Sequence, residues 1–124
     1  MTMMKWRAGV ARVVVVSIAA LAGVASADAA TPVTAADIAN AQAIYKANAC
    51  ISCHSAERKV IGPAYRDIAA KYKNDSGAQV HLEKVVRVGG SGVWGAIPMP
   101  SHPRMSDADI KTVVNWILAG APDK

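Results

Sequence analysis

The sequence predicts an all-α protein. Four segments place apolar residues three and four positions apart, as one face of a helix requires, and Gly, Pro or capping residues separate these segments. No run of useful length alternates apolar and polar residues as a half-buried strand does, and no internal repeat is visible. We therefore expect a fold of about four short helices.

The first 27 residues differ from the rest and are typical of a secretory signal peptide. Their start is basic, and the uncharged run 13–24 ends in the small-residue pattern Ala25, Ser26, Ala27. About a dozen apolar residues are too few for a membrane span, which needs roughly 20. We predict a Sec-type signal peptide over residues 1–27, cleaved after Ala27, and export to the periplasm. The alternative is a retained membrane anchor.

Residues 28–124 have room for one domain with a modest core, and their charge is nearly balanced. The full chain has a formal charge of +5, from 14 basic and 9 acidic residues. Three basic residues and no acidic ones lie in the predicted leader, so 11 basic residues face 9 acidic ones after cleavage. This balance, without a basic run interleaved with aromatic residues, argues against nucleic acid as a partner.

The first helix is expected to run from Thr34 to about Asn48. Thr34 stands three residues before Asp37, a spacing typical of a capping box. The predicted apolar face of this helix consists of Ile38, Ala41, Ile44 and Tyr45. Small residues would let another helix approach closely, namely Ala39, Ala41 and Ala43. The helix would lead the chain directly to a pair of cysteines.

Two more helices are expected after the cysteines. Gly62 breaks the chain, and Pro63 is expected at the first position of a short helix that ends within 74–77. A third helix is expected over 78–88, before a pair of glycines. The segment 91–103 contains three prolines and two glycines and is expected to be a loop. A long ordered loop usually has a task.

The last helix is expected to begin at Ser106 and to end before Gly120. Two aspartates in its first turn would interact favourably with the helix dipole. Met105 stands where a hydrophobic staple residue would pack against the next turn. The predicted buried stripe consists of Ile110, Val113, Val114, Ile117 and Leu118, with Trp116 in the core.

Cys50, Cys53 and His54 form the spacing C-x-x-C-H, the pattern of covalent haem attachment. Two thiols add to the two vinyl groups of the porphyrin, and the histidine that follows reaches the iron. We therefore predict one haem c bound through Cys50 and Cys53, with His54 as an iron ligand. A thioredoxin-like pair would need a βαβ pattern, and a zinc site would need four ligands, for which the chain adds only His81 and His102.

The second axial ligand would decide what the haem does, because an open position allows chemistry on small molecules and a filled one makes an electron carrier. Met99 lies between two prolines, which restrict the backbone on both sides, so we predict Met99 as this ligand. His102 is the rival, and a bis-histidine haem would have a lower potential. Met105 is expected to be structural and His81 to lie at the surface.

The chain resembles the small class I bacterial cytochromes c, in particular the cytochrome c-551 (c8) group. The resemblance spans nearly all of 28–124 and rests on the Cys50 to His54 motif, on residues 60–65 and, most distinctively, on residues 92–100. It implies a cytochrome c fold around one covalently bound haem. It also implies that Met99 is the distal ligand, that the Pro63 carbonyl orients His54, and that Trp94 donates a hydrogen bond to a haem propionate.

Two features of this loop remain open. A position in the hydrophobic core is the alternative for Trp94. The segment 101–104 looks slightly longer than the family pattern, and His102 stands near the place where a small amide residue often contacts the methionine sulfur. The fine tuning of the haem potential therefore does not follow from the resemblance.

The resemblance also implies a function. We expect a monomeric, periplasmic mono-haem electron carrier, and not an enzyme, that passes single electrons between respiratory complexes by transient docking. Partners of this kind would be a cytochrome bc1-type complex, a terminal oxidase, a nitrite reductase or a peroxidase. The alternatives are a gas-binding or enzymatic haem protein with an open sixth position, and a haem subunit of a larger dehydrogenase or reductase. No membrane span is expected after cleavage.

Overall fold

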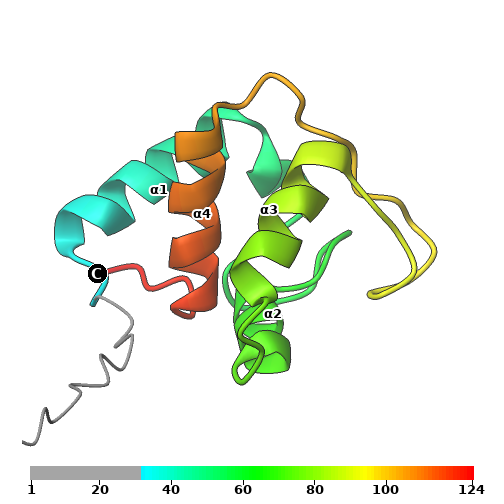
Figure 1. Ribbon diagram of the computed structural model, residues 1–124, viewed down its shortest axis with the longest axis horizontal. Helices are drawn as coiled ribbons and strands as arrows, with labels where there is room; N and C mark the ends of the chain where they lie inside the picture. Colours follow the sequence, from blue (N-terminus) through cyan, green and yellow to red (C-terminus); the bar gives the residue numbers. More distant parts are fainter. Residues whose placement is uncertain (1–31) are drawn as a thin grey trace, which may run out of the picture. The chain divides into compact units, whose positions relative to one another are not determined.

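Four α-helices and one short 3-10 turn form the fold of the computed structural model, which describes residues 32–124 (Figure 1). They are α1 (Ala35–Ala47), η1 (Cys50–Ser52), α2 (Tyr65–Tyr72), α3 (Ala78–Val88) and α4 (Asp107–Leu118). Within residues 32–124, pairing of the β type is limited to an isolated bridge. The predicted all-α class is therefore confirmed, whereas the predicted signal peptide, residues 1–27, lies outside the described residues.

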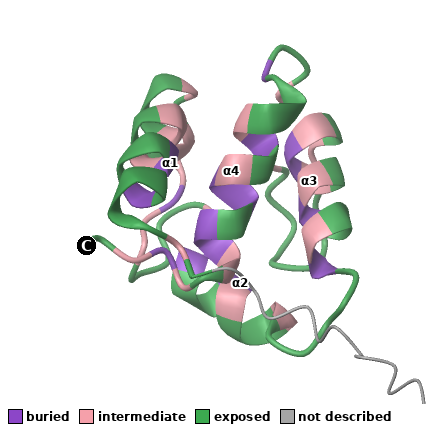
Figure 2. Cartoon of the chain, turned by 60° about the vertical axis from the view of Figure 1, so that its left-hand side comes forward, coloured by how far each residue is buried: buried purple, intermediate pink, exposed green. Residues whose placement is uncertain are grey.

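The helix α4 is the centre of the core. α1, α2 and α3 all pack against it, and Figure 2 shows α4 between α1 and α3 with buried residues along its length. Full burial of a valine, leucine or isoleucine side chain contributes about 1.5–3 kcal/mol to the free energy of unfolding, relative to an exposed side chain. The predicted stripe is confirmed for Ile110, Val113, Val114 and Ile117, which α4 buries together with Trp116, whereas Leu118 is half-buried. None of the helices in the described part of the chain is long and apolar enough to cross a membrane.

The helix α1 begins with the predicted capping box and meets α4 through a narrow face. The Thr34 side chain accepts a hydrogen bond from the Asp37 amide, and the Asp37 carboxylate accepts one from the Thr34 amide. Ala41 is fully buried, but Ala39 and Ala43 are exposed, so the prediction of a three-alanine contact was wrong. The reason is geometric, because each helical residue turns the side chain by about 100° and residues two apart cannot share one face.

An aromatic cluster joins α1, α2 and α4. The rings of Tyr45 and Trp116 are stacked with centroids 5.4 Å apart, and Tyr65 meets the Trp116 ring edge-on at 5.4 Å. The buried indole of Trp116 donates a hydrogen bond to the Pro122 carbonyl, at 2.8 Å. Because Tyr65 opens α2, the cluster fixes the start of that helix against the rest of the core.

The helix α2 starts two residues later than expected. Ala64 is its N-cap, in an extended conformation (φ −63°, ψ 145°), and the helix begins at Tyr65. Pro63 therefore precedes the cap instead of occupying the first helical position. This displacement leaves the Pro63 carbonyl outside the helix and able to accept a hydrogen bond from elsewhere.

Candidate haem-binding site

The cysteine motif lies in a tight turn directly after α1. Ala49 has a left-handed conformation (φ 57°), which is uncommon for a residue with a side chain, and it reverses the chain into η1. The amides of Cys53 and His54 both donate to the Cys50 carbonyl, at 3.1 and 3.0 Å. Both thiols are free and half-buried. Burial raises the pKa of the Cys50 thiol, so it is protonated at neutral pH.

The imidazole of His54 is buried and held in one orientation. Its Nδ1 lies 2.8 Å from the Pro63 carbonyl oxygen, which can only accept, so Nδ1 carries the hydrogen. In the neutral ring Nε2 is then unprotonated and has a lone pair for a metal. The Tyr65 ring is stacked on the imidazole with centroids 5.2 Å apart, and burial raises the pKa of the Tyr65 phenol, which keeps it neutral.

The backbone of Gly62 lies directly against the His54 ring, and the sequence reasoning missed this role. A Cβ on Gly62 would lie 2.4 Å from Cε1 of His54 and 2.8 Å from each ring nitrogen. The Gly62 amide also donates to the Cys53 carbonyl, at 2.7 Å, so the glycine backbone has little room to move. In the sequence, Gly62 was noted as a break before a proline and as part of the stretch 60–65 that carries the resemblance, without a contact to His54.

Met99 is positioned mainly by its backbone. Its amide donates to the Gly90 carbonyl at 2.8 Å, and the Gly90 amide donates to the Met99 carbonyl at 3.1 Å. These bonds close the loop after α3 into a hairpin-like excursion, and the Met99 side chain packs half-buried against the core. Gly89 adjoins this bridge with φ +76°, and a Cβ there would lie 2.5 Å from the Met99 carbonyl oxygen.

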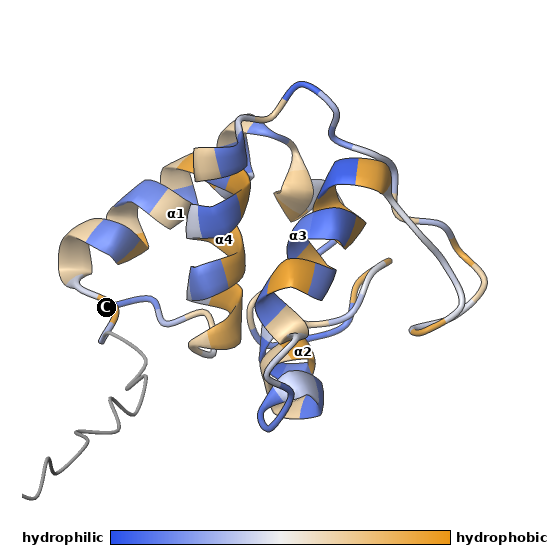
Figure 3. Ribbon diagram, viewed as in Figure 1, coloured by the Kyte–Doolittle hydropathy of each residue, from blue (hydrophilic) through white to orange (hydrophobic). Residues whose placement is uncertain are grey.

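Trp94 lies in the same loop but not in the hydrophobic core. Its side chain is 37 % exposed, and the Lys71 ammonium lies 5.6 Å from the centre of its ring. Other large apolar residues of this loop, and of the segment that begins between the two cysteines, are also exposed, namely Ile51, Val60, Ile61, Val93 and Ile97. Figure 3 shows hydrophobic colour in both stretches of chain. Exposed apolar side chains in these two stretches suit contact with a large apolar group.

The other candidate ligands have different surroundings. The His102 amide donates to the Val86 carbonyl at 3.1 Å, and its buried Nδ1 has no hydrogen-bond partner within the described residues. Met105 is buried and belongs to the same core cluster as Ile110, as a staple residue should. His81 is exposed, as predicted, with Nε2 3.3 Å from the Tyr72 hydroxyl.

The donor set fits a covalently bound haem. Two free thiols lie next to a histidine with a fixed tautomer, and the large apolar side chains of Ile51, Val60 and Ile61, between and after the cysteines, are exposed. The packed surroundings of His54 come from Gly62, Pro63 and Tyr65, in the segment that folds back on the motif. A polar metal site would instead need several charged ligands gathered at one point.

Comparison with known proteins identifies the family. The family model "Cytochrome c" matches residues 38–121. The chain is 52 % identical over 73 residues to cytochrome c-552 of Nitrosomonas europaea, covering 59 % of this chain and 71 % of that protein. It is 51 % identical over 69 residues to cytochrome c-551 of Allochromatium vinosum, covering 56 % and 73 %.

Solved structures agree with the sequence comparison. The crystal structure of wild-type Nitrosomonas europaea cytochrome c552 superposes with a TM-score of 0.60 at 49 % identity, over 62 % of this chain and 95 % of that one. The class 1 cytochrome MtoD of Sideroxydans lithotrophicus gives a TM-score of 0.61 at 26 % identity, over 68 % and 96 %. The chain therefore belongs to the cytochrome c family, as a class I electron carrier of the c-551 group with one haem attached through Cys50 and Cys53.

Proposed function

We propose that this chain is a periplasmic carrier of single electrons whose haem iron is held between His54 and Met99. When bound, the haem supplies an iron that alternates between the ferrous and ferric states. With both axial positions filled by the protein, no substrate reaches the metal and no bond is made or broken, so the protein would not be an enzyme.

The orientation of His54 is the observation that carries this proposal. The Pro63 carbonyl accepts from Nδ1 at 2.8 Å, which directs the lone pair of Nε2 away from that bond. The ring is also packed between Gly62 and Tyr65, so it cannot rotate freely. A ligand fixed before the metal arrives needs little reorganisation when the iron changes its charge.

The distal side supports methionine as the second ligand. Prolines flank Met99, and two backbone hydrogen bonds to Gly90 fix its main chain, so the thioether has few conformations to lose on binding. A methionine ligand raises the haem potential relative to a second histidine. Trp94, half-exposed in the same loop, would donate its indole N–H to a haem propionate.

Export and partners complete the proposal. The leader pattern of residues 1–27 supports cleavage after Ala27, release into the periplasm and a haem domain over 28–124. Mass spectrometry of the protein from a periplasmic fraction should then give a chain that starts at Asp28 and carries one haem.

The monomer would dock briefly on respiratory complexes, such as a cytochrome bc1-type complex, a terminal oxidase, a nitrite reductase or a peroxidase, through apolar residues near the haem edge.

Absorption spectroscopy of the holoprotein tests the ligand pair. The oxidised wild type should show the weak far-red charge-transfer band between methionine sulfur and ferric iron, and M99A should lose it. M105L is the matched control, because it replaces the other methionine of residues 28–124 by a side chain of similar volume and should keep the band.

Carbon monoxide gives the opposite readout. The ferrous wild type should resist carbon monoxide, whereas ferrous M99A should bind it, because truncation opens the sixth position. A wild type that lacks the far-red band and binds carbon monoxide readily would contradict the proposal and favour a gas-binding or enzymatic haem protein. If M99A kept the band, the sulfur ligand would be Met105, the other methionine of residues 28–124.

A further inference from the structure

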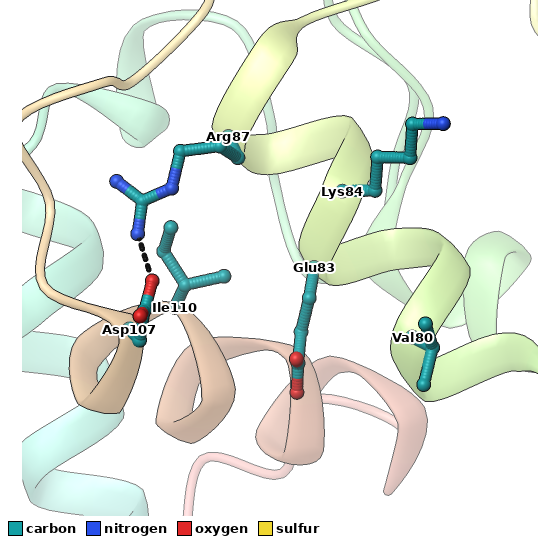
Figure 4. A pocket seen from close by; sticks show the side chains of 6 residues that line it. All are labelled: Val80, Glu83, Lys84, Arg87, Asp107 and Ile110. Atoms are coloured by element: carbon teal, nitrogen blue, oxygen red, sulfur yellow. Dashed lines mark hydrogen bonds and ion pairs between the residues drawn. The ribbon is translucent and has the colours of Figure 1, made fainter.

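Arg87, in the last turn of α3, contacts the segment that joins the Met99 loop to α4. One guanidinium nitrogen donates to three backbone carbonyl oxygens, those of His102 (3.3 Å), Pro103 (3.1 Å) and Met105 (2.5 Å). The other terminal nitrogen forms an ion pair with Asp107 at the start of α4, which Figure 4 shows as a bridge between the two helices. The Arg87 side chain thus binds four acceptors within residues 102–107.

These carbonyls have a particular need for such a donor. The segment 100–106 lies outside the helices, and although the His102 carbonyl also accepts from the Met105 amide at 3.3 Å, the Pro103 and Met105 carbonyls have Arg87 as their donor. The planar guanidinium has five N–H donors and suits several acceptors at once, which a lysine ammonium on a flexible stem does not. The Arg87 side chain is only 29 % exposed, so these hydrogen bonds are partly shielded from water.

The opposite end of the segment is anchored on α3 as well. The His102 amide donates to the Val86 carbonyl, and the Gly90 bridge holds the backbone of Met99. Between Met99 and Met105 the chain is therefore held at both ends by the C-terminal turn of α3 and the residues just after it. Met99 cannot swing outward unless part of this set of bonds breaks.

We propose that Arg87 is a positioning residue that holds the segment from Met99 to Met105 against α3 and thereby resists displacement of Met99 from the iron. This inference rests on the proposed function, in which Met99 is the distal ligand. An external ligand can bind the ferric iron only when Met99 has left, so its apparent affinity reports the population of the open loop.

Titration of the ferric holoprotein with imidazole measures that population. R87Q, which keeps much of the side-chain length, should bind imidazole about tenfold more tightly than the wild type, corresponding to about 1.4 kcal/mol. R87K should lie between them, because an ammonium reaches fewer of the carbonyls together. Hydrogen exchange at the His102 amide, which depends on the loop and not on the iron, should be faster in R87Q by a similar factor.

Three control variants separate this effect from others. K84A removes a positive charge from the same helix, and Lys84 points away from Asp107 in Figure 4, so imidazole affinity should not change. D107N removes the ion pair but leaves the three carbonyl contacts, and its effect should be small because Asp107 is 99 % exposed. T34A lowers global stability at the start of α1 and should leave imidazole binding unchanged.

The outcomes are distinguishable. If the wild type shows the far-red band and R87Q binds imidazole no better than the wild type, the positioning role is wrong while the proposed function stands. The role is equally wrong if T34A raises imidazole affinity as much as R87Q does, because the effect then follows overall stability. If the oxidised wild type lacks the band, the proposed function fails first and the claim about Met99 falls with it.

Discussion

The two axial sides of the haem site are built in different ways. His54 is held through its ring, by the Pro63 carbonyl, the face of Tyr65 and the backbone of Gly62, all within twelve residues of chain. Met99 is held through its backbone, by two hydrogen bonds to Gly90, just after α3. The histidine side is a packed cradle, whereas the methionine side is a restrained loop.

This difference has a physical consequence. A packed cradle is sensitive to volume, because close-packed neighbours cannot move apart cheaply. A restrained loop is sensitive to the loss of hydrogen bonds and to backbone conformation, and it opens locally before the whole protein unfolds. We therefore expect substitutions on the histidine side to act on global stability, and substitutions on the methionine side to act first on the iron–methionine bond.

G62A should have the largest effect. The new Cβ would stand 2.4 Å from Cε1 of His54, and the Gly62 amide is tied to the Cys53 carbonyl, so the ring must leave its position. We expect a loss of about 3 kcal/mol in the free energy of unfolding, together with poor haem loading. Denaturant unfolding of the holoprotein measures the loss.

G90A is the matched control for this experiment. A Cβ at Gly90 meets nothing within 4 Å, and no positive φ is required there, so the variant should be as stable as the wild type or slightly more stable. A G62A holoprotein that unfolds within about 0.5 kcal/mol of G90A would show that the cradle yields easily and that the contrast between the two sides is mistaken.

G89A should cost less stability but act on the methionine side. Gly89 has φ 76° and ψ −173°, a region almost confined to glycine, and the added Cβ would meet the Met99 carbonyl oxygen at 2.5 Å. We expect a loss of about 2 kcal/mol in the free energy of unfolding. The far-red band of ferric iron should weaken while the haem stays attached, as absorption spectra of purified holoprotein would reveal. An intact band would mean that the loop tolerates a shift of its backbone.

Much of the fold could be predicted from the sequence because it depends on local signals. The Thr34 capping box, the Ser106 cap and the glycine after Val88 marked helix ends that the structure confirms. The predicted start of α2 was two residues too early. The sequence pattern is the same whether the proline occupies the first helical position or lies one or two residues before it. The Pro63 carbonyl accepts from the His54 ring across nine residues, a contact that the family resemblance implied but that no local pattern shows.

In the candidate site, too, the features with a local sequence pattern were predicted, and those that depend on tertiary contacts were missed. The cysteine spacing is a covalent pattern within five residues, so the haem prediction needed no tertiary structure, and the family comparisons confirm it. Gly62, Gly89 and Arg87 were missed because their importance lies in contacts with segments that are distant in the sequence or reached only by a turn. A single glycine or arginine has no periodicity that would distinguish it from an ordinary break or a solvated charge.

T34A should give the smallest effect and serves as a reference that touches neither axial side. Loss of the N-cap hydroxyl should cost about 1 kcal/mol in the free energy of unfolding at neutral pH. The far-red band should be unchanged, because residues of the cap contact neither His54 nor Met99. A weakened band would mean that global stability alone controls the iron–methionine bond, which would remove the basis for separating the two sides.

The pH dependence of the same variant gives an independent check. Hydrogen bonds from the Thr34 side chain and then its backbone lower the pKa of Asp37 below its usual value of 3.8. Since the pKa in the folded state is the lower one, this stabilisation is complete above the unfolded value and disappears as the pH falls through the folded value. The stability difference between wild type and T34A should therefore shrink in acid. Carbon-13 NMR titration of the Asp37 carboxyl should show its pKa return toward 3.8 in T34A.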